Sequence, residues 1–292
     1  MAKEAADNFQ RYLDRLAPMP SELKKGAIHR ASVKSCLTKA FGIYSLFETG
    51  SIRNGTGIRH FSDTDYFAVM RKEDLRSNSG EQLRRLKDDL QYTFWRTKNI
   101  RVNSPAVTIP FGTYRSEHLE ITPCFFNGTM GTPLGHRKSY GIPNGSGGWM
   151  LASPQAHKAF VEYQDRRLKG GLRPLIKLIK AWKFERNVPV ASFYLELRIA
   201  SMFAGRQRVY LVSDVFSVLN TLCENEFARV RDPMQVSGYV NPSSTDEKRR
   251  TALSKLETAR SRARKALHYF ERDPKRSLYY WRLLFGPNFP IT

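Results

Sequence analysis

The spacing of apolar and polar residues along this chain predicts helices first, then strands, then helices again. Apolar positions recur at helical spacing over residues 4–16, which Pro18 and Pro20 should end, and over residues 22–41, where Ser21 is the expected cap. Short runs rich in β-branched and aromatic residues predict strands at 43–47, 65–70, 100–104, 106–109 and 118–126. A helix with one apolar side lies between the second and third of these strands.

From residue 149 onward helical spacing dominates the pattern. Ser153 and Pro154 are typical of a helix start, and helices are predicted at 154–168, 172–186, 192–203, 214–229 and 246–272. Ser213 is the expected cap of the fourth, and the aromatic tail should pack back on the body. Because residues 127–148 are dense in Gly, Pro, Ser, Thr and Asn, they should form a loop or hairpin that joins two lobes. We therefore expect two domains, residues 1–150 and 151–292.

The stretch from Gly50 to Met70 carries the strongest chemical signal. Gly50 and Ser51 form a turn whose backbone N–H groups and hydroxyl could bind phosphate oxygens. Asp63 and Asp65 lie two residues apart at the start of a strand, so they share one face. Two like charges so close disfavour folding unless a cation lies between them, and a divalent metal is the usual solution.

A third carboxylate from a neighbouring strand would complete a two-metal site. Glu120, near the start of the strand at 118–126, is the best candidate, and Glu117 is the alternative. Three carboxylates with two Mg²⁺ or Mn²⁺ ions suit phosphoryl transfer without a separate general base. His60 precedes the acids, but a single loop histidine is more often incidental than catalytic.

The composition shows that the chain carries a large net positive charge. The 292 residues contain 48 Lys and Arg against 27 Asp and Glu, a formal net charge of +21 that favours nucleotides or nucleic acid as partners. Three scattered cysteines argue against a disulfide framework or a structural zinc site. The start resembles an amphipathic helix and not a signal peptide, and no apolar stretch is long enough to span a bilayer. We expect a soluble cytoplasmic monomer that does not bind membranes.

Five motifs in order resemble a known family. These motifs are GS followed by SDTD, HLEITPCF, GIPNGSGGWMLASPQAH, LIKLIKAWK and SFYLE. Together they are similar to those of a bacterial CD-NTase of the SMODS type, a family akin to cyclic GMP-AMP synthase and the oligoadenylate synthetases. The resemblance covers roughly residues 40–203, and the helices before it fit the family's spine helix weakly. It implies an α+β fold: a polymerase-β-like nucleotidyltransferase core with a mixed sheet, plus a helical C-terminal lobe that closes the nucleotide cleft.

The same resemblance implies an activity and a set of residues. The family joins NTPs into cyclic di- or trinucleotides, releases pyrophosphate, and activates a downstream effector in antiphage (CBASS) defence. The residues that match its metal-binding and catalytic acids are Asp63, Asp65 and Glu120. Those that match its nucleotide-binding positions, ATP among the substrates, are Gly50, Ser51, Lys180, Ser192 and Phe193. Two departures are Glu120, where Asp is common, and Phe193, where Tyr is common.

Alternatives remain open at this stage. The same fold could make a linear oligonucleotide or transfer a nucleotide to tRNA or protein, and an inactive core could serve as a basic nucleic-acid-binding protein. The basic run at 248–265 could bind RNA as an activator, although most such runs are solvated helix faces. Lys177 and Lys183 lie on the same basic flank as Lys180, and for these two a functional and a solvated role are about equally favoured.

Overall fold

The computed structural model describes residues 2–113 and 117–291, and these residues form two compact units. The first, here called the sheet unit, contains Pro18–Ala159 and Met234–Ser237. The second, the helical unit, contains the residues up to Ala17, Phe160–Pro233, and the residues from Gly238 onward. No helix within the described residues is long and apolar enough to cross a membrane.

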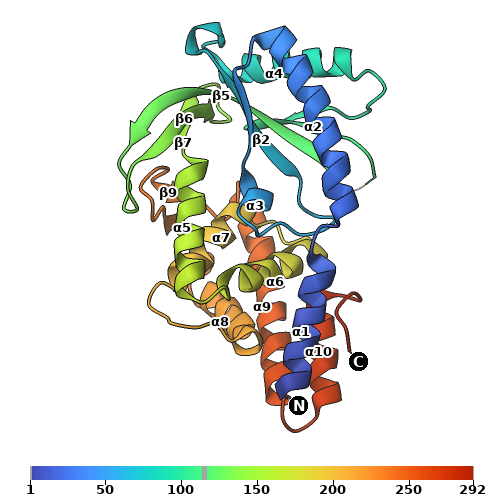
Figure 1. Ribbon diagram of the computed structural model, residues 1–292. Helices are drawn as coiled ribbons and strands as arrows, with labels where there is room; N and C mark the ends of the chain where they lie inside the picture. The colour runs from blue at the N-terminus through green and yellow to red at the C-terminus, as the bar shows by residue number, and fades with distance from the viewer. Residues whose placement is uncertain (1, 114–116, 292) are drawn as a thin grey trace. The chain divides into compact units, whose positions relative to one another are not determined.

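Within the described residues, the sheet unit is built on a mixed sheet of seven strands (Figure 1). The strands are β1 Ser45–Glu48, β2 Thr64–Met70, β3 Arg101–Asn103, β4 Ala106–Pro110, β5 His118–Met130, β6 Arg137–Pro143 and β7 Trp149–Ala152. The order is β1-β2-β5-β4-β3, with β6 paired to β5 and β7. Strands β2 and β5 are parallel, and the other pairs are antiparallel. The central pair is therefore the one that carries the predicted acids.

Side-chain alternation divides the two faces of this sheet. One face packs against α2 Pro20–Phe41 and α4 Ser79–Thr93, and it buries Tyr66, Ala68 and Met70 of β2. The opposite face carries a smaller cluster that includes Phe67 and Val69. The remaining helices of the sheet unit are the short α3 Gly50–Arg53 and η1 Lys72–Asp74, while α5 Pro154–Arg167 crosses the boundary between the units. The first face therefore forms the main core of the sheet unit, and the second carries the smaller apolar cluster.

The helical unit contains most of the later part of the chain. Its helices are α1 Ala2–Leu16, α6 Leu172–Glu185, α7 Ser192–Met202, α8 Leu211–Glu224, α9 Asp246–His268 and α10 Pro274–Phe285. The short strands β8 Val230–Arg231 and β9 Tyr239–Val240 pair antiparallel. An α+β class with a mixed sheet and a helical C-terminal part is thus confirmed.

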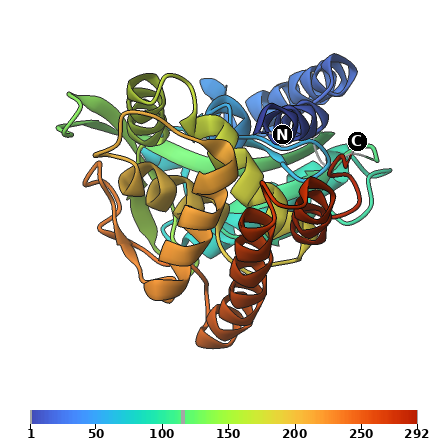
Figure 2. The same ribbon diagram turned by 90° about the horizontal axis from the view of Figure 1, so that it is seen from below.

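The first helix groups with the last one, as Figures 1 and 2 show. Phe9 meets the ring of Trp281 edge to face at 5.1 Å, and the Tyr12 hydroxyl donates to the carbonyl of Phe285 at 3.1 Å. Residues 2–17 therefore lie in the helical unit, whereas the expected domains placed them with the core. The cause is the aromatic stripe of α10, which buries the apolar side of α1.

Several helix ends differ from the sequence predictions. Helix α2 begins at Pro20, and the Glu22 carboxylate accepts from the N–H of Met19, so Ser21 is not its cap. Helix α8 begins before Ser213 and is stabilised by Asp214, whose carboxylate accepts from the N–H of Tyr210. Ser153 does cap α5, since its hydroxyl accepts from the N–H of Ala156.

The end of the chain is more helical than its sequence suggested. The expected helix at 246–272 ends at His268, and the aromatic tail forms α10. Asp273 starts α10 by accepting from the N–H of Arg276, and Pro274 occupies the first helical position. The predicted helix stopped at Arg272, directly before this start signal, and the residues after it were expected only to pack back on the body.

Candidate active site

The parallel pairing of β2 and β5 places two predicted acids side by side. Asp65 lies opposite Glu120 in the register, so both side chains leave the same face of the sheet. That face is opposite the main core, because Asp65 shares it with Phe67 and Val69 and not with Tyr66 and Ala68. Asp63 precedes the strand by one residue. The sheet therefore brings Asp65 and Glu120 together and carries Asp63 to the same end.

The Gly50 turn lies directly against the Asp65 carboxylate. The N–H of Thr49 donates to the carbonyl of Asp65 at 2.7 Å. A Cβ on Gly50 would come within 1.8 Å of Asp65 Oδ2, and Gly50 has φ +64°. Only glycine fits both demands. Ser51 follows in α3, so the predicted phosphate turn and the predicted acid form one local structure.

Asp63 has a neighbour that the sequence analysis did not identify. His118 Nδ1 lies 3.6 Å from Asp63 Oδ1 at the start of β5. His118 is two residues before Glu120, so the strand's alternation was the available signal. His60, by contrast, has its Nδ1 3.9 Å from Glu22 Oε1.

Two neutral side chains hold Glu120. Asn103 Nδ2 and Thr108 Oγ1 donate to the same oxygen, Glu120 Oε1, at 3.1 and 3.0 Å. Thr108 is the register partner of Glu120 on β4, and Asn103 is on β3. Since both donors use Oε1, the second carboxylate oxygen is the one suited to a cation. These contacts depend on the order of the strands, so sequence reasoning missed them.

The alternative third acid has a different environment. Glu117 is 3% exposed, its Oε1 lies 3.7 Å from Lys25 Nζ, and a Cβ on Gly112 would overlap its Oε2. The Glu117 carboxylate is therefore packed against Gly112 and close to Lys25 of α2. Glu120, by contrast, lies opposite Asp65 in the register.

The donor set suits a hard divalent cation, since carboxylate oxygens are the ligands that Mg²⁺ prefers. Among residues 2–113 and 117–291, no group of three or more His, Cys, Asp and Glu side chains converges closely enough to hold a metal ion. Strand register and the Gly50 turn thus place the acids at one edge, while their side chains are not drawn together into one cluster.

The helical unit holds the other predicted residues. Lys180 is fully buried, and its ammonium donates to Glu196 Oε1 at 2.8 Å. Lys183 donates to Ser192 Oγ at 2.7 Å, and Phe193 is 39% exposed. Lys180 and Lys183 are therefore both tied to α7, but through different partners.

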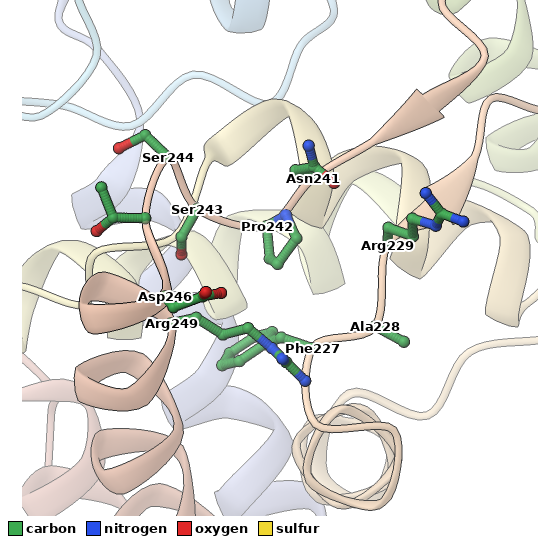
Figure 3. A pocket seen from close by; sticks show the side chains of 10 residues that line it. Phe227, Ala228, Arg229, Asn241, Pro242, Ser243, Ser244, Asp246 and Arg249 are labelled. Carbon is green, nitrogen blue, oxygen red and sulfur yellow. The ribbon is translucent and has the colours of Figure 1, made fainter.

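A pocket of about 490 Å³ lies elsewhere in the helical unit (Figure 3). It is lined by Phe227, Ala228, Arg229, Asn241, Pro242, Ser243, Ser244, Thr245, Asp246 and Arg249. The Ser243 hydroxyl donates to the carbonyl of Pro189, and the N–H of Ala191 donates to that of Pro242, both at 2.7 Å. None of the predicted site residues lines this pocket, yet its wall is bonded to the segment that leads into α7.

No family model matches the chain, but individual relatives do. It is 26% identical over 154 residues to a cyclic AMP-AMP-AMP synthase of Acinetobacter sp., covering 49% of this chain and 44% of the relative. It is 24% identical over 145 residues to a probable cyclic nucleotide synthase of Bacillus cereus, covering 49% and 43%. The matches thus span about half the length of the curated relatives.

Solved structures extend the similarity to nearly the whole chain. CdnC of E. coli MS115-1 with ATP superimposes with a TM-score of 0.73 at 17% identity, over 97% of this chain and 98% of that one. The chain has the fold of the CdnC nucleotidyltransferase. DncV, the Vibrio cholerae cyclic AMP-GMP synthase, in complex with a linear intermediate, gives a TM-score of 0.64 at 15% identity, over 84% and 69%. The resemblance to bacterial CD-NTases and the predicted fold are thereby confirmed.

Proposed function

We propose that this protein is a metal-dependent nucleotidyltransferase that joins NTPs into a cyclic di- or trinucleotide and releases pyrophosphate. The observation that carries this proposal is the register of β2 and β5, which sets Asp65 beside Glu120 with Gly50 against the Asp65 carboxylate. The names of the relatives support the same chemistry, since they include cyclic AMP-AMP-AMP synthase and cyclic AMP-GMP synthase.

In this proposal Asp63, Asp65 and Glu120 hold two Mg²⁺ or Mn²⁺ ions. Bound there, the ions would lower the pKa of an attacking hydroxyl and neutralise the charge of the leaving pyrophosphate. Asn103 and Thr108 keep Glu120 at its place, which offsets the longer arm of Glu relative to Asp.

The remaining predicted residues would bind the nucleotide. Gly50 lets the backbone approach a phosphate, and the Ser51 hydroxyl would bind its oxygens. In the helical unit, Ser192 and Lys180 are the predicted phosphate residues, and Phe193 offers a partly exposed ring on which a base can stack. Since both named product types of the relatives contain adenine, ATP is the first substrate to test.

We also propose a role in antiphage signalling, in which the product activates a separate effector. CdnC has been solved in complex with a HORMA protein, so we include a protein among the partner classes to test. RNA bound to the basic residues of 248–265 is another. For the chain itself we propose a cytoplasmic monomer.

Labelled NTPs test the activity directly. Purified protein is incubated with each NTP, alone and mixed, with Mg²⁺ or Mn²⁺, and the products are treated with phosphatase and identified by mass spectrometry. We expect a phosphatase-resistant cyclic product that is lost in Asp65→Asn and kept in Asp74→Asn, an exposed acid of η1. A product shortened by phosphatase would support a linear synthetase, and label on RNA or protein would support transfer. Full product from Asp65→Asn would refute the assigned site.

A further inference from the structure

A groove of about 570 Å³ lies in the helical unit, along the exposed side of α10. Three of its lining residues are basic, namely Arg186, Lys275 and Arg282, and none of the described residues that line it is acidic. Most of the others present apolar or aromatic side chains, among them Tyr279 and Leu283. The groove contains none of the predicted nucleotide or metal residues, so it is separate from the candidate active site.

Basic and apolar side chains follow one another along this side of α10. Lys275, Tyr279 and Arg282 are four and three residues apart, which places them on one side of the helix. At about 1.5 Å of rise per residue, Lys275 and Arg282 are roughly 10 Å apart along the helix axis, with Tyr279 between them. Tyr279 is 55% exposed, so its ring is accessible to a partner. A fitting ligand therefore carries negative charge on both sides of a bulky apolar group.

The chain after α10 forms another wall of the groove, and several contacts hold it in place. Phe289 is 1% exposed and stacks on Phe285 with ring centroids 5.4 Å apart, and Arg15 donates to the carbonyl of Asn288 at 2.8 Å. The chain end thus turns back beside α10 and leaves Ile291 exposed at the groove (Figure 1). Because the walls are already ordered, little conformational entropy is lost when a ligand binds between them.

Positive charge at the end of α10 exceeds the negative charge that the protein places there. Arg186 and Arg262 both donate to the carbonyl of Leu283, at 2.6 and 2.7 Å. Within residues 2–113 and 117–291, neither guanidinium lies within ion-pair distance of a carboxylate. The C-terminus of a helix supplies about half a negative charge, and the Glu185 carboxylate lies against Gly286. These charges offset only part of the charge of the two guanidinium groups and of the other basic residues of the groove.

The chemistry of the groove distinguishes between classes of partner. A second copy of this chain is disfavoured, because it would bring a formal net charge of +21 to a basic surface. A nucleic acid would pair its phosphates with the basic residues and leave the apolar lining unused. We propose that the groove binds a segment of a partner protein in which acidic residues flank a bulky apolar residue. This inference goes beyond the proposed nucleotidyltransferase function and does not depend on it, since the groove and the candidate active site share no residue.

Fluorescent peptides test the proposal through anisotropy titrations of the whole chain. The first peptide has Glu at both ends and Leu and Phe in the middle. In the second, Ser replaces the apolar residues, and in the third, Gln replaces the Glu residues. We expect the first peptide to bind saturably and the other two to bind about tenfold more weakly, because each lacks one of the two kinds of contact. A single-stranded DNA oligonucleotide with the charge of the first peptide is titrated in parallel.

Charge reversal in the groove locates the binding. Lys275→Glu/Arg282→Glu should weaken binding of the first peptide about tenfold or more, and Tyr279→Ser should weaken it through lost apolar contact. The matched control, Lys169→Glu/Arg208→Glu, makes the same change in net charge at two exposed positions of the helical unit outside the groove. It should remain within about twofold of wild type, and all three variants should unfold near the wild-type temperature.

Three results would each overturn the proposal. The first is no saturable binding of the first peptide below about 1 mM. The second is an equal loss in the groove variant and the control, which would assign the binding to the net charge of the chain. The third is DNA that binds more tightly than the first peptide and is lost in the groove variant, which would make the groove a nucleic-acid site. Synthesis of a cyclic product by wild type is measured separately, so failure of either proposal leaves the other standing.

Discussion

The acids of the sheet unit and the lysines of the helical unit are positioned by different physical means. Asp65 and Glu120 are fixed by strand register, and the Gly50 turn lies against one of them, so local backbone geometry decides where they lie. Lys180 and Lys183 are three residues apart on one helix and differ only in what packs against them. In this molecule strand pairing fixes where the two acids lie, whereas the environment of each lysine depends on its neighbours.

The buried pair of the helical unit should give the largest single effect. Lys180→Met leaves the Glu196 carboxylate buried without its cation, which costs about 3–5 kcal/mol. Urea unfolding of the purified variant measures this loss. The double variant with Glu196→Met should recover most of it, because two apolar groups of similar size replace the pair. If the free energy of unfolding of the single variant falls by less than about 1 kcal/mol, the pair does not hold α7 in place.

The Gly50 turn gives the next largest effect, and it tests the acid side of the comparison. Gly50→Ala should lower kcat/KM more than about 100-fold, because the new Cβ must displace the Asp65 carboxylate, and small displacements of catalytic groups are costly. The control is Gly128→Ala, which has a similarly positive φ but no atom near the added Cβ. Equal losses in the two variants would mean that backbone strain, and not contact with Asp65, causes the effect.

The hydrogen bonds to Glu120 should have a smaller effect that is specific to the metal. Thr108→Val removes one of the two donors, and loss of such a supporting contact typically weakens metal affinity or activity by on the order of 10- to 100-fold. The measurement is the Mg²⁺ concentration needed for half-maximal rate, together with Mn²⁺ binding followed by electron paramagnetic resonance. Thr108→Ser keeps the hydroxyl and should remain close to wild type. An unchanged metal requirement in Thr108→Val would show that Thr108 is only structural.

The sequence predicts the strand-borne acids better than it predicts the contacts that surround them. The short runs of β-branched and aromatic residues at 65–70 and 118–126 were enough to find β2 and β5 and to place Asp63, Asp65 and Glu120 near their starts. The sequence could not supply the contacts of Asn103 and Thr108 with Glu120, because these require the strand order β5-β4-β3. The alternation of β5 pointed to His118, but its approach to Asp63 depends on the pairing of β2 with β5.

The same limit applied to the helices. The α6 pattern predicted a buried side and a basic flank, but the burial of Lys180 depends on Glu196 sixteen positions later. The position of α1 likewise depends on aromatic residues of α10 at the far end of the chain. Long-range partners decide these features, and no local pattern records them.

The smallest expected effect is a pH dependence that tests whether Lys183 contacts the triphosphate. The pKa of Lys183 is lowered to about 8, first by burial and then by Lys180, with Glu196 opposing. The groups that face it are Lys180 and the ring of Phe184 on α6, and Ser192 and Glu196 on α7. If the triphosphate binds the ammonium form, affinity is full below this pKa and falls as pH rises through it. Between pH 7 and pH 9 the protonated fraction falls about tenfold, which sets the largest expected loss of ATP affinity.

Lys183→Arg supplies the control, because a guanidinium stays charged over this whole range. Its ATP affinity should therefore change little between pH 7 and pH 9, while that of wild type falls. The triphosphate itself is fully ionised above neutral pH, so it contributes little to the slope. A fall of the same size in the arginine variant would assign the titration to another group and separate Lys183 from the phosphate.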